Sequence, residues 1–173
     1  MDSGGHLMAS ITFKAVLPKK AKLIDQAKLK RELNRALDVT GDIIRNDFRS
    51  TTRTWSQRNK PSFGKIGPKN FKDARGIEVN TKSRIYFFLT RGTRDHFVGP
   101  KRASALRFQS GYKAKTARRV IGSGSGGAFG PVRFSKGHIV SGIRARDFDK
   151  AIAKKNQKKF QRRIQAAVFR ASS

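Results

Sequence analysis

The chain has 173 residues, which suits one domain of ordinary size and fits two domains poorly. Forty lysines and arginines face 11 aspartates and glutamates, and the net charge of +29 indicates anionic partners, either nucleic acid or acidic protein surfaces. The lack of cysteine excludes a disulfide scaffold, a Cys-ligated zinc site and a thiol nucleophile, and no apolar run approaches the ~20 residues of a membrane span.

Residues 1–10 are small and polar, and they are predicted to be a flexible leader. One interpretation places the natural start at Met8, after a cloning remnant, and the alternative is a native disordered arm. No signal peptide is recognised, so we expect a soluble, intracellular protein in which residues 11–173 form a single domain.

Two periodic segments open this domain. Ile11–Val16 alternates apolar and polar residues and predicts a strand. From Lys22 to about Thr52 the apolar residues recur mostly every four or seven positions, which predicts a long amphipathic helix. Gly41 interrupts this helix at a cost of about 1 kcal/mol relative to alanine. Such a helix must lie across a whole sheet or reach a neighbouring subunit.

The middle of the chain is predicted to hold a loop and a hairpin. Residues 55–70 mix proline and glycine with basic residues, so we expect an extended loop anchored on the body by Trp55 and Phe63. Ile77–Thr81 and Ile85–Thr90 follow as the two strands of a hairpin. The second strand is apolar through its middle, which is typical of a central strand buried on both faces.

Residues 94–143 are rich in glycine, lysine and arginine. Three short apolar islands within them predict short strands: Ala105–Phe108, Val120–Ile121 and Val132–Phe134. The sequence therefore predicts an α+β fold, with a small, mostly antiparallel sheet packed against a long N-terminal helix and a C-terminal helix, and with long basic loops.

The C-terminal helix is expected from about Arg146 to Ala171. Its large apolar residues fall four or eight apart and should face the core as one stripe: Phe148, Ile152, Phe160, Ile164 and Val168. After Asp149 the chain has eight lysines and arginines and no carboxylate. Eight cations exceed what the helix dipole explains, so this basic face should meet solvent or an anion.

Two motifs resemble functional sites but lack the neighbouring elements or residues that such sites need. Gly122–Gly127 fits the G-x-G-x-x-G pattern of dinucleotide sites, but Ala128–Pro131 follows where a helix is required, so we predict a flexible loop that binds no nucleotide. Asp95 and His96 resemble an acid–base pair, yet no third group lies near them, and His96 is expected to bond a loop carbonyl instead.

The three histidines and the carboxylates show no metal-ligand spacing, so we predict no catalytic residue, no metal and no cofactor. We therefore expect a protein that is not an enzyme. A small basic nuclease remains a rival class, and it would need Asp73, Glu78, Asp95 and His96 to converge.

The most specific string is Arg91-Gly-Thr-Arg-Asp-His-Phe-Val-Gly-Pro-Lys-Arg-Ala-Ser-Ala-Leu-Arg-Phe108, followed later by Lys136–Phe148 and an aromatic-led last helix. In this order the chain resembles the tail-component family of long-tailed bacteriophages, also called minor tail or tail-completion (neck) proteins. That family often has His-Pro-Gly where this sequence has His138-Ile139-Val140. The resemblance covers roughly residues 20–171.

The resemblance implies a non-enzymatic virion protein of the head–tail junction or upper tail, present in the host cytoplasm during assembly. It implies a homo-oligomeric ring that completes the tail and joins adjoining connector, neck or tail-tube proteins, with non-specific contact to phage DNA in the channel and none to a membrane. Basic residues interleaved with apolar ones form the candidate assembly interface: Arg94, His96, Lys101, Arg102, Lys113, Lys115, Arg118 and Arg119. The alternative is a non-specific nucleic-acid-binding protein of ribosomal or nucleoid type.

Overall fold

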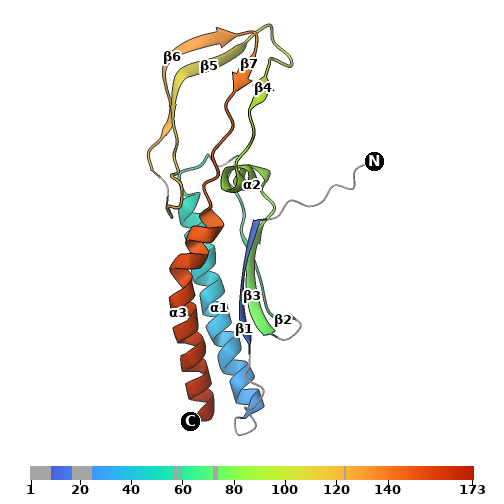
Figure 1. Ribbon diagram of the computed structural model, residues 1–173, viewed down its shortest axis with the longest axis vertical. Coiled ribbons are helices and arrows are strands. Elements are labelled where there is room, and N and C mark those ends of the chain that lie inside the picture. The colour runs from blue at the N-terminus through green and yellow to red at the C-terminus, as the bar shows by residue number, and fades with distance from the viewer. Residues whose placement is uncertain (1–8, 17–24, 57, 59, 72–73, 123) are drawn as a thin grey trace, which may run out of the picture.

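The computed structural model describes residues 9–16, 25–56, 58, 60–71, 74–122 and 124–173. The fold is α+β, with two long helices beside a small antiparallel sheet and an arm of four strands beyond them (Figure 1). We call residues 93–146 the arm and the rest of the described chain the body. Most of the expected leader, residues 1–8, lies outside the described residues, while residues 9 and 10 already belong to the first strand.

The sheet of the body has the order β1-β3-β2. Its strands are β1 (Ala9–Val16), β2 (Gly64–Phe71) and β3 (Ala74–Thr81), and both pairings are antiparallel. Alternate residues of β1 and β3 point to the same face, so Ile11 lies opposite Val79 and Phe13 lies opposite Ile77, all four buried. This face forms one wall of the core.

The two long helices form the other wall. They are α1 (Gln26–Thr51) and α3 (Phe148–Ser172), which lie side by side and pack on the sheet (Figure 1). Asp25 caps α1 by accepting hydrogen bonds from the amides of Ala27 and Lys28, at 2.8 and 3.1 Å. The long N-terminal and C-terminal helices are confirmed, although residues 22–24 lie outside the described chain.

Aromatic side chains fill the core where the helices meet the sheet. Phe48 stacks on Phe63 at a centroid distance of 4.9 Å and meets Tyr86 edge-on at 5.6 Å. Phe63 is buried and Trp55 packs on the same cluster, so both expected anchors are confirmed. The α3 stripe is confirmed as well: Phe148, Ile152 and Phe160 are buried, and Ile164 and Val168 pack against the core.

The predicted second strand of the hairpin is wrong, because Ile85–Thr90 lies within a helix, α2 (Arg84–Arg91). The Ser83 hydroxyl accepts a hydrogen bond from the Tyr86 amide at 3.3 Å, and Gly92 (φ 84°) ends the helix. Tyr86 and Thr90, four apart, are the buried residues of α2. The β-branched and aromatic composition favoured a strand, but the caps and the burial of one helical face prevail.

Two further predictions need correction. Residues 64–70, expected as loop, form most of β2, because backbone pairing with β3 tolerates the Gly67–Pro68 irregularity as a shift in register. The central strand of the sheet is consequently β3, with β1 and β2 on either side of it. The island Val120–Ile121 lies in no strand, whereas the other two islands lie in strands of the arm.

Candidate assembly interface

The arm is built from four strands that return the chain to the body. These are β4 (His96–Val98), β5 (Leu106–Lys113), β6 (Gly127–Ser135) and β7 (His138–Val140). They pair as two separate antiparallel ribbons, β4 with β7 and β5 with β6, and they extend beyond α2, away from the body sheet (Figure 1). A two-stranded ribbon is at best marginally stable by itself in water.

The arm has no hydrophobic core within the described residues. Of those in the range 93–122 and 124–146, Thr116 alone is buried. Nine large apolar side chains of the arm are exposed: Phe97, Phe108, Tyr112, Val120, Phe129, Val132, Phe134, Ile139 and Ile143. The arm therefore exposes its large apolar side chains instead of burying them.

The apolar side chains of the arm form cross-strand pairs. Phe97 of β4 lies opposite Ile139 of β7, and the two residues are 67% and 73% exposed. The Phe97 ring covers Gly137 (φ 139°), where any Cβ would lie 2.4 Å from the ring. In the other ribbon the Phe129 ring covers Gly111 in the same way, at 2.5 Å. The rings are therefore held in place while their outer faces stay uncovered.

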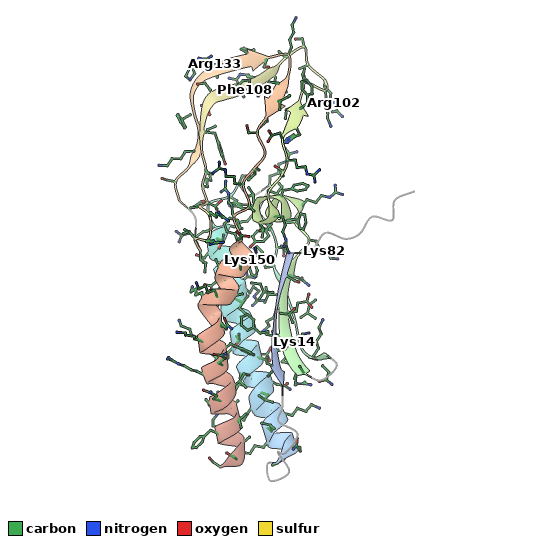
Figure 2. The ribbon with its side chains drawn as sticks, viewed as in Figure 1. Lys14, Lys82, Arg102, Phe108, Arg133 and Lys150 are labelled. Carbon is green, nitrogen blue, oxygen red and sulfur yellow. The ribbon has the colours of Figure 1, made fainter. Side chains whose placement is uncertain are left out.

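The arm is also strongly basic, with twelve lysines and arginines against one carboxylate, Asp95. Asp95 accepts a hydrogen bond from the Gly142 amide at 2.6 Å. This bond joins the residue before β4 to the segment that follows β7. Figure 2 shows Arg102 and Arg133 reaching outward from the far end of the arm. The arm therefore presents exposed apolar and cationic groups together.

Hydrogen bonds fix the base of the arm to the body. The Arg146 and Asp147 amides donate to the carbonyls of Leu89 and Thr90 in α2, at 3.1 and 3.2 Å. The Lys115 ammonium donates to the Thr54 carbonyl after α1, at 3.0 Å. The arm is thus anchored at its base and projects from the body as a defined element.

Three cations surround the Asp147 carboxylate where the arm joins the body. Asp147 is buried, sits in the left-handed region (φ 49°) and accepts a hydrogen bond from the Lys150 ammonium at 2.9 Å. Arg118 and Arg119 lie 3.6 and 3.9 Å from the same carboxylate. The Lys150 bond, with the arginine charges, lowers the pKa of Asp147.

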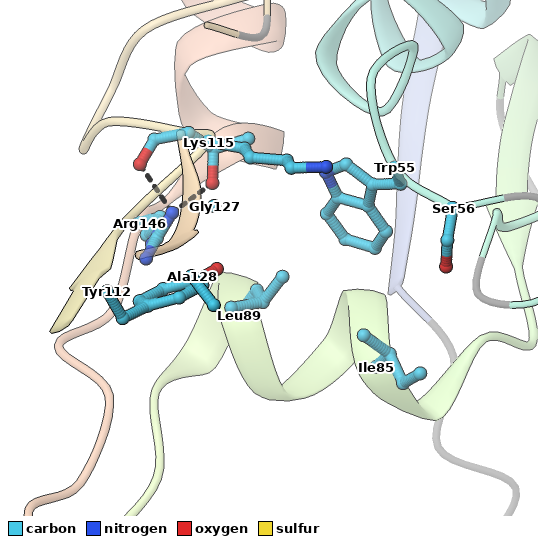
Figure 3. Close-up of a pocket in the computed structure, with 10 residues that line it drawn as sticks. Trp55, Ser56, Ile85, Leu89, Tyr112, Lys115, Gly127, Ala128 and Arg146 are labelled. Atoms are coloured by element: carbon cyan, nitrogen blue, oxygen red, sulfur yellow. Dashed lines mark hydrogen bonds between the residues drawn. The ribbon is translucent and has the colours of Figure 1, made fainter. Parts of the chain in front are cut away.

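A cavity of about 330 Å³ separates the base of the arm from α2 (Figure 3). Trp55, Leu89 and Tyr112 contribute apolar surface to it, and the Arg146 guanidinium donates to the carbonyl and hydroxyl of Thr116 at its edge. Burial lowers the pKa of Arg146. Among the described residues, the lining of this cavity includes no carboxylate and no histidine.

The structure spreads the eight predicted interface residues along the arm. Lys101 and Arg102 occupy the turn between β4 and β5 at the far end, whereas Lys115, Arg118 and Arg119 lie at the base. Lys113 ends β5. Arg94 and His96 lie at the start of β4, where His96 Nδ1 is 3.1 Å from the Arg94 carbonyl oxygen, so the expected loop-carbonyl contact of His96 is confirmed.

The nine described carboxylates are all engaged in intramolecular contacts. Seven form ion pairs, Asp25 caps α1 and Asp95 binds the Gly142 amide. No cluster that could hold a metal is found in the part of the chain that the structure describes. Of the nuclease set, Glu78 binds Lys69 in the body sheet while Asp95 and His96 lie in the arm, and Asp73 lies outside the described residues.

Sequence patterns missed part of the apolar surface of the arm. β7, with Ile139, lies in a segment that we did not assign as a strand, and Phe97 precedes the first island. The available signal was alternation: His138-Ile139-Val140 carries a large apolar residue next to a polar one, as does Val132-Arg133-Phe134, which we did assign to a strand.

Comparison with known proteins finds no matching family model, no similar curated protein and no similar solved structure. In the described residues, no helix combines the length and the apolar character that crossing a membrane requires.

Proposed function

We propose that this chain is a structural, non-enzymatic subunit of a larger assembly and that the arm binds neighbouring subunits. The observation that carries the proposal is an ordered arm of which, among its described residues, only Thr116 is buried while nine large apolar side chains are exposed. An isolated arm of this kind gains little from burial, so contact with a partner is its natural source of stability.

The resemblance of residues 91–108 extends this proposal to the phage head–tail junction or upper tail, with the chain in a homo-oligomeric ring that completes the tail and joins the connector. These residues run from the end of α2 through β4 and the outer turn into β5, so the resembling string lies mostly in the arm. In this chain the Gly92–Thr93 turn closes a helix, whereas in the family it closes a strand.

The positive charge of the subunits limits which contacts could hold such a ring together. Subunits of charge +29 repel one another, so short-range apolar contacts between arms and bodies must hold the ring, and acidic neighbouring proteins or DNA must offset the charge. Adjoining connector, neck or tail-tube proteins are the protein partners that this proposal names. The chain would then act in the virion, after assembly in the host cytoplasm.

Analytical ultracentrifugation of the purified chain tests the arm directly. We expect the wild-type chain to form a concentration-dependent oligomer and the triple variant Phe97→Ser, Phe134→Ser, Ile139→Ser to sediment as a monomer. The matched control is Val39→Ser with Phe169→Ser, two exposed apolar side chains of the body, 44% and 72% exposed. An arm variant that keeps the wild-type oligomer, or a wild-type chain that stays monomeric, contradicts the proposal.

Head–tail joining, scored as infectious particles, tests the charged part of the interface. Arg118 and Arg119 pair with Asp147 of the same chain, so substituting them also disturbs the base of the arm. Lys101→Ala with Arg102→Ala is cleaner, since both are exposed and form no ion pair among the described residues. We expect this pair to abolish joining while Lys158→Ala with Lys159→Ala is nearly silent.

Non-specific nucleic-acid binding is the second candidate. Four exposed cations on α3 favour it, because none has a carboxylate partner in the described chain: Lys154, Lys158, Lys159 and Arg162. Size-exclusion chromatography separates the candidates, since a ring without DNA supports assembly and a monomer that shifts only with DNA supports binding.

A further inference from the structure

A basic cleft lies on the body at the point where β3 passes into α2. It has a volume of about 560 Å³ and is bounded on one side by residues 58, 60–62 and 64 and on the other by residues 80–85. Four cations line it, two from each side: Arg58, Lys60, Lys82 and Arg84. Figure 2 shows Lys82 beside the first turn of α2.

The fold brings the two pairs of cations together from distant parts of the sequence. On one side, the Thr81 hydroxyl accepts from the Ser83 amide at 3.3 Å and Ser83 caps α2, which fixes the chain between Lys82 and Arg84. On the other side, buried Phe63 anchors the segment that follows Lys60. The backbone is therefore held at residues 81–84 on one side of the cleft and at Phe63 on the other.

The charge of this cleft is not balanced within the protein. Among the described residues, none of its four cations forms an ion pair, and no carboxylate lines the cleft. The side-chain amide of Asn80, which lines the cleft, donates a hydrogen bond to the Glu78 carboxylate. That carboxylate is already paired with the Lys69 ammonium at 3.0 Å. By contrast, Lys65 of neighbouring β2 is neutralised by Asp38 and Asp42.

The chemistry of the lining distinguishes between two kinds of anionic partner. Protein interfaces are depleted of charged residues at their centre, and of lysine in particular. This cleft has lysine and arginine on both sides, and Pro61 and Ile85 are the apolar side chains that line it. The arm differs from the cleft because nine large apolar side chains are exposed beside its cations. The lining of the cleft suits the phosphate backbone of a nucleic acid. Lysine and arginine bind phosphates and displace counterions, and these contacts supply most of the affinity of a protein for nucleic acid.

We propose that this cleft binds the phosphodiester backbone of a nucleic acid without reading its sequence. Phosphate oxygens accept hydrogen bonds from Lys60 and Lys82 and from the guanidinium groups of Arg58 and Arg84. The proposal does not depend on the arm, because one subunit holds all four cations. It gives the protein two separate surfaces, an apolar arm for protein and a basic cleft for nucleic acid.

Fluorescence anisotropy with a labelled random-sequence DNA duplex tests the cleft in the full-length chain. The test variant is Lys82→Ala with Arg84→Ala, and the matched control is Lys158→Ala with Lys159→Ala, which removes the same charge from the exposed face of α3. For the test variant we expect the slope of log K against log salt to fall in magnitude by about 2, and affinity to fall by about tenfold at moderate salt. The control should change affinity by less than about threefold.

Two further measurements separate a loss of DNA binding from a loss of folding or of assembly. Thermal melting should be unchanged in both variants, since all four substituted side chains are exposed, and Lys82→Gln with Arg84→Gln should reproduce the binding loss. The monomeric arm variant should bind DNA as the wild type does, so a failure of the assembly proposal is distinguishable from a failure of this one.

Three outcomes overturn the proposal. Equal losses in the cleft and α3 variants would show that the whole positive field binds DNA. Absence of DNA binding by the wild type at about 50 mM salt would show that nucleic acid is not the ligand of the cleft. Displacement of the duplex by poly-glutamate as effectively as by unlabelled DNA would assign the cleft to an acidic protein.

Discussion

The body and the arm contain the same kinds of side chain and use them differently. In the body Phe48 is fully buried against Phe63 and Tyr86, while in the arm Phe134 is 70% exposed. In the body the carboxylates offset nearby cations, whereas in the arm twelve lysines and arginines face one aspartate. The body buries most of its aromatic rings in a core, whereas the arm leaves its large apolar side chains exposed.

The largest expected effect contrasts one phenylalanine from each region. Phe48→Ala should lower the free energy of unfolding by about 3–5 kcal/mol, because it removes a buried ring and leaves a cavity. Phe134→Ala should change it by less than about 0.5 kcal/mol, because the ring is exposed. Urea denaturation of both variants as monomers measures the difference. A loss of several kcal/mol from Phe134→Ala would reveal packing within the arm and break the comparison.

The next effect concerns a polar contact between the long helices of the body. The Asn156 amide is buried and donates to the Asp47 carboxylate at 2.8 Å, while Lys155 pairs with the other oxygen at 2.6 Å. Asn156→Ala should cost about 1–3 kcal/mol, because the buried carboxylate loses a hydrogen-bond donor. Gln157→Ala is the control on the exposed face of α3. Matching urea midpoints for the two variants would contradict a structural role for this contact.

A smaller effect tests how closely α1 approaches the sheet. A Cβ on Gly41 would lie 2.7 Å from Cγ1 of Ile77 and 2.9 Å from Cδ of Lys65. Helix propensity favours alanine by about 1 kcal/mol, but overpacking costs about 1–3 kcal/mol. Gly41→Ala should therefore destabilise the protein slightly, by about 1 kcal/mol on balance. Calorimetry that finds a raised melting temperature would show that the helix can move away from the sheet.

The last prediction concerns pH at the base of the arm. Since the pKa of Asp147 is lowered in the folded protein, its ionised form stabilises the fold at pH values above the unfolded pKa of about 3.9. That contribution is lost as the pH falls through the lowered, folded pKa. Asp147→Asn keeps the left-handed backbone (φ 49°), which asparagine tolerates, and removes the charge.

The melting temperatures of wild type and Asp147→Asn should therefore differ at neutral pH and converge below about pH 4. Other carboxylates with lowered pKa, among them Glu32 and Glu78, destabilise both proteins equally in acid and cancel in the comparison. A difference that stays constant down to pH 3 would show that the Asp147 charge is not what holds the base of the arm.

Local patterns were enough to predict the frame of the body. α1 and α3 are long, so their apolar residues repeat over many turns and the helical period is unambiguous. The same repeats identified the buried stripe of α3, and the large side chains of Trp55 and Phe63 identified the anchors of a segment without regular period. The high positive charge and the lack of cysteine needed no structure at all.

Contacts between distant residues decided the rest. Residues 84–91 have the composition of a strand, yet the Ser83 cap and the burial of Tyr86 against Phe48 and Phe148 make them a helix. The ribbon pairings of the arm, the narrow space at Gly41 and the convergence of Arg58 and Lys60 with residues 82–84 join segments far apart in sequence. No local period encodes them, because they arise from which surfaces meet when the helices and strands pack together.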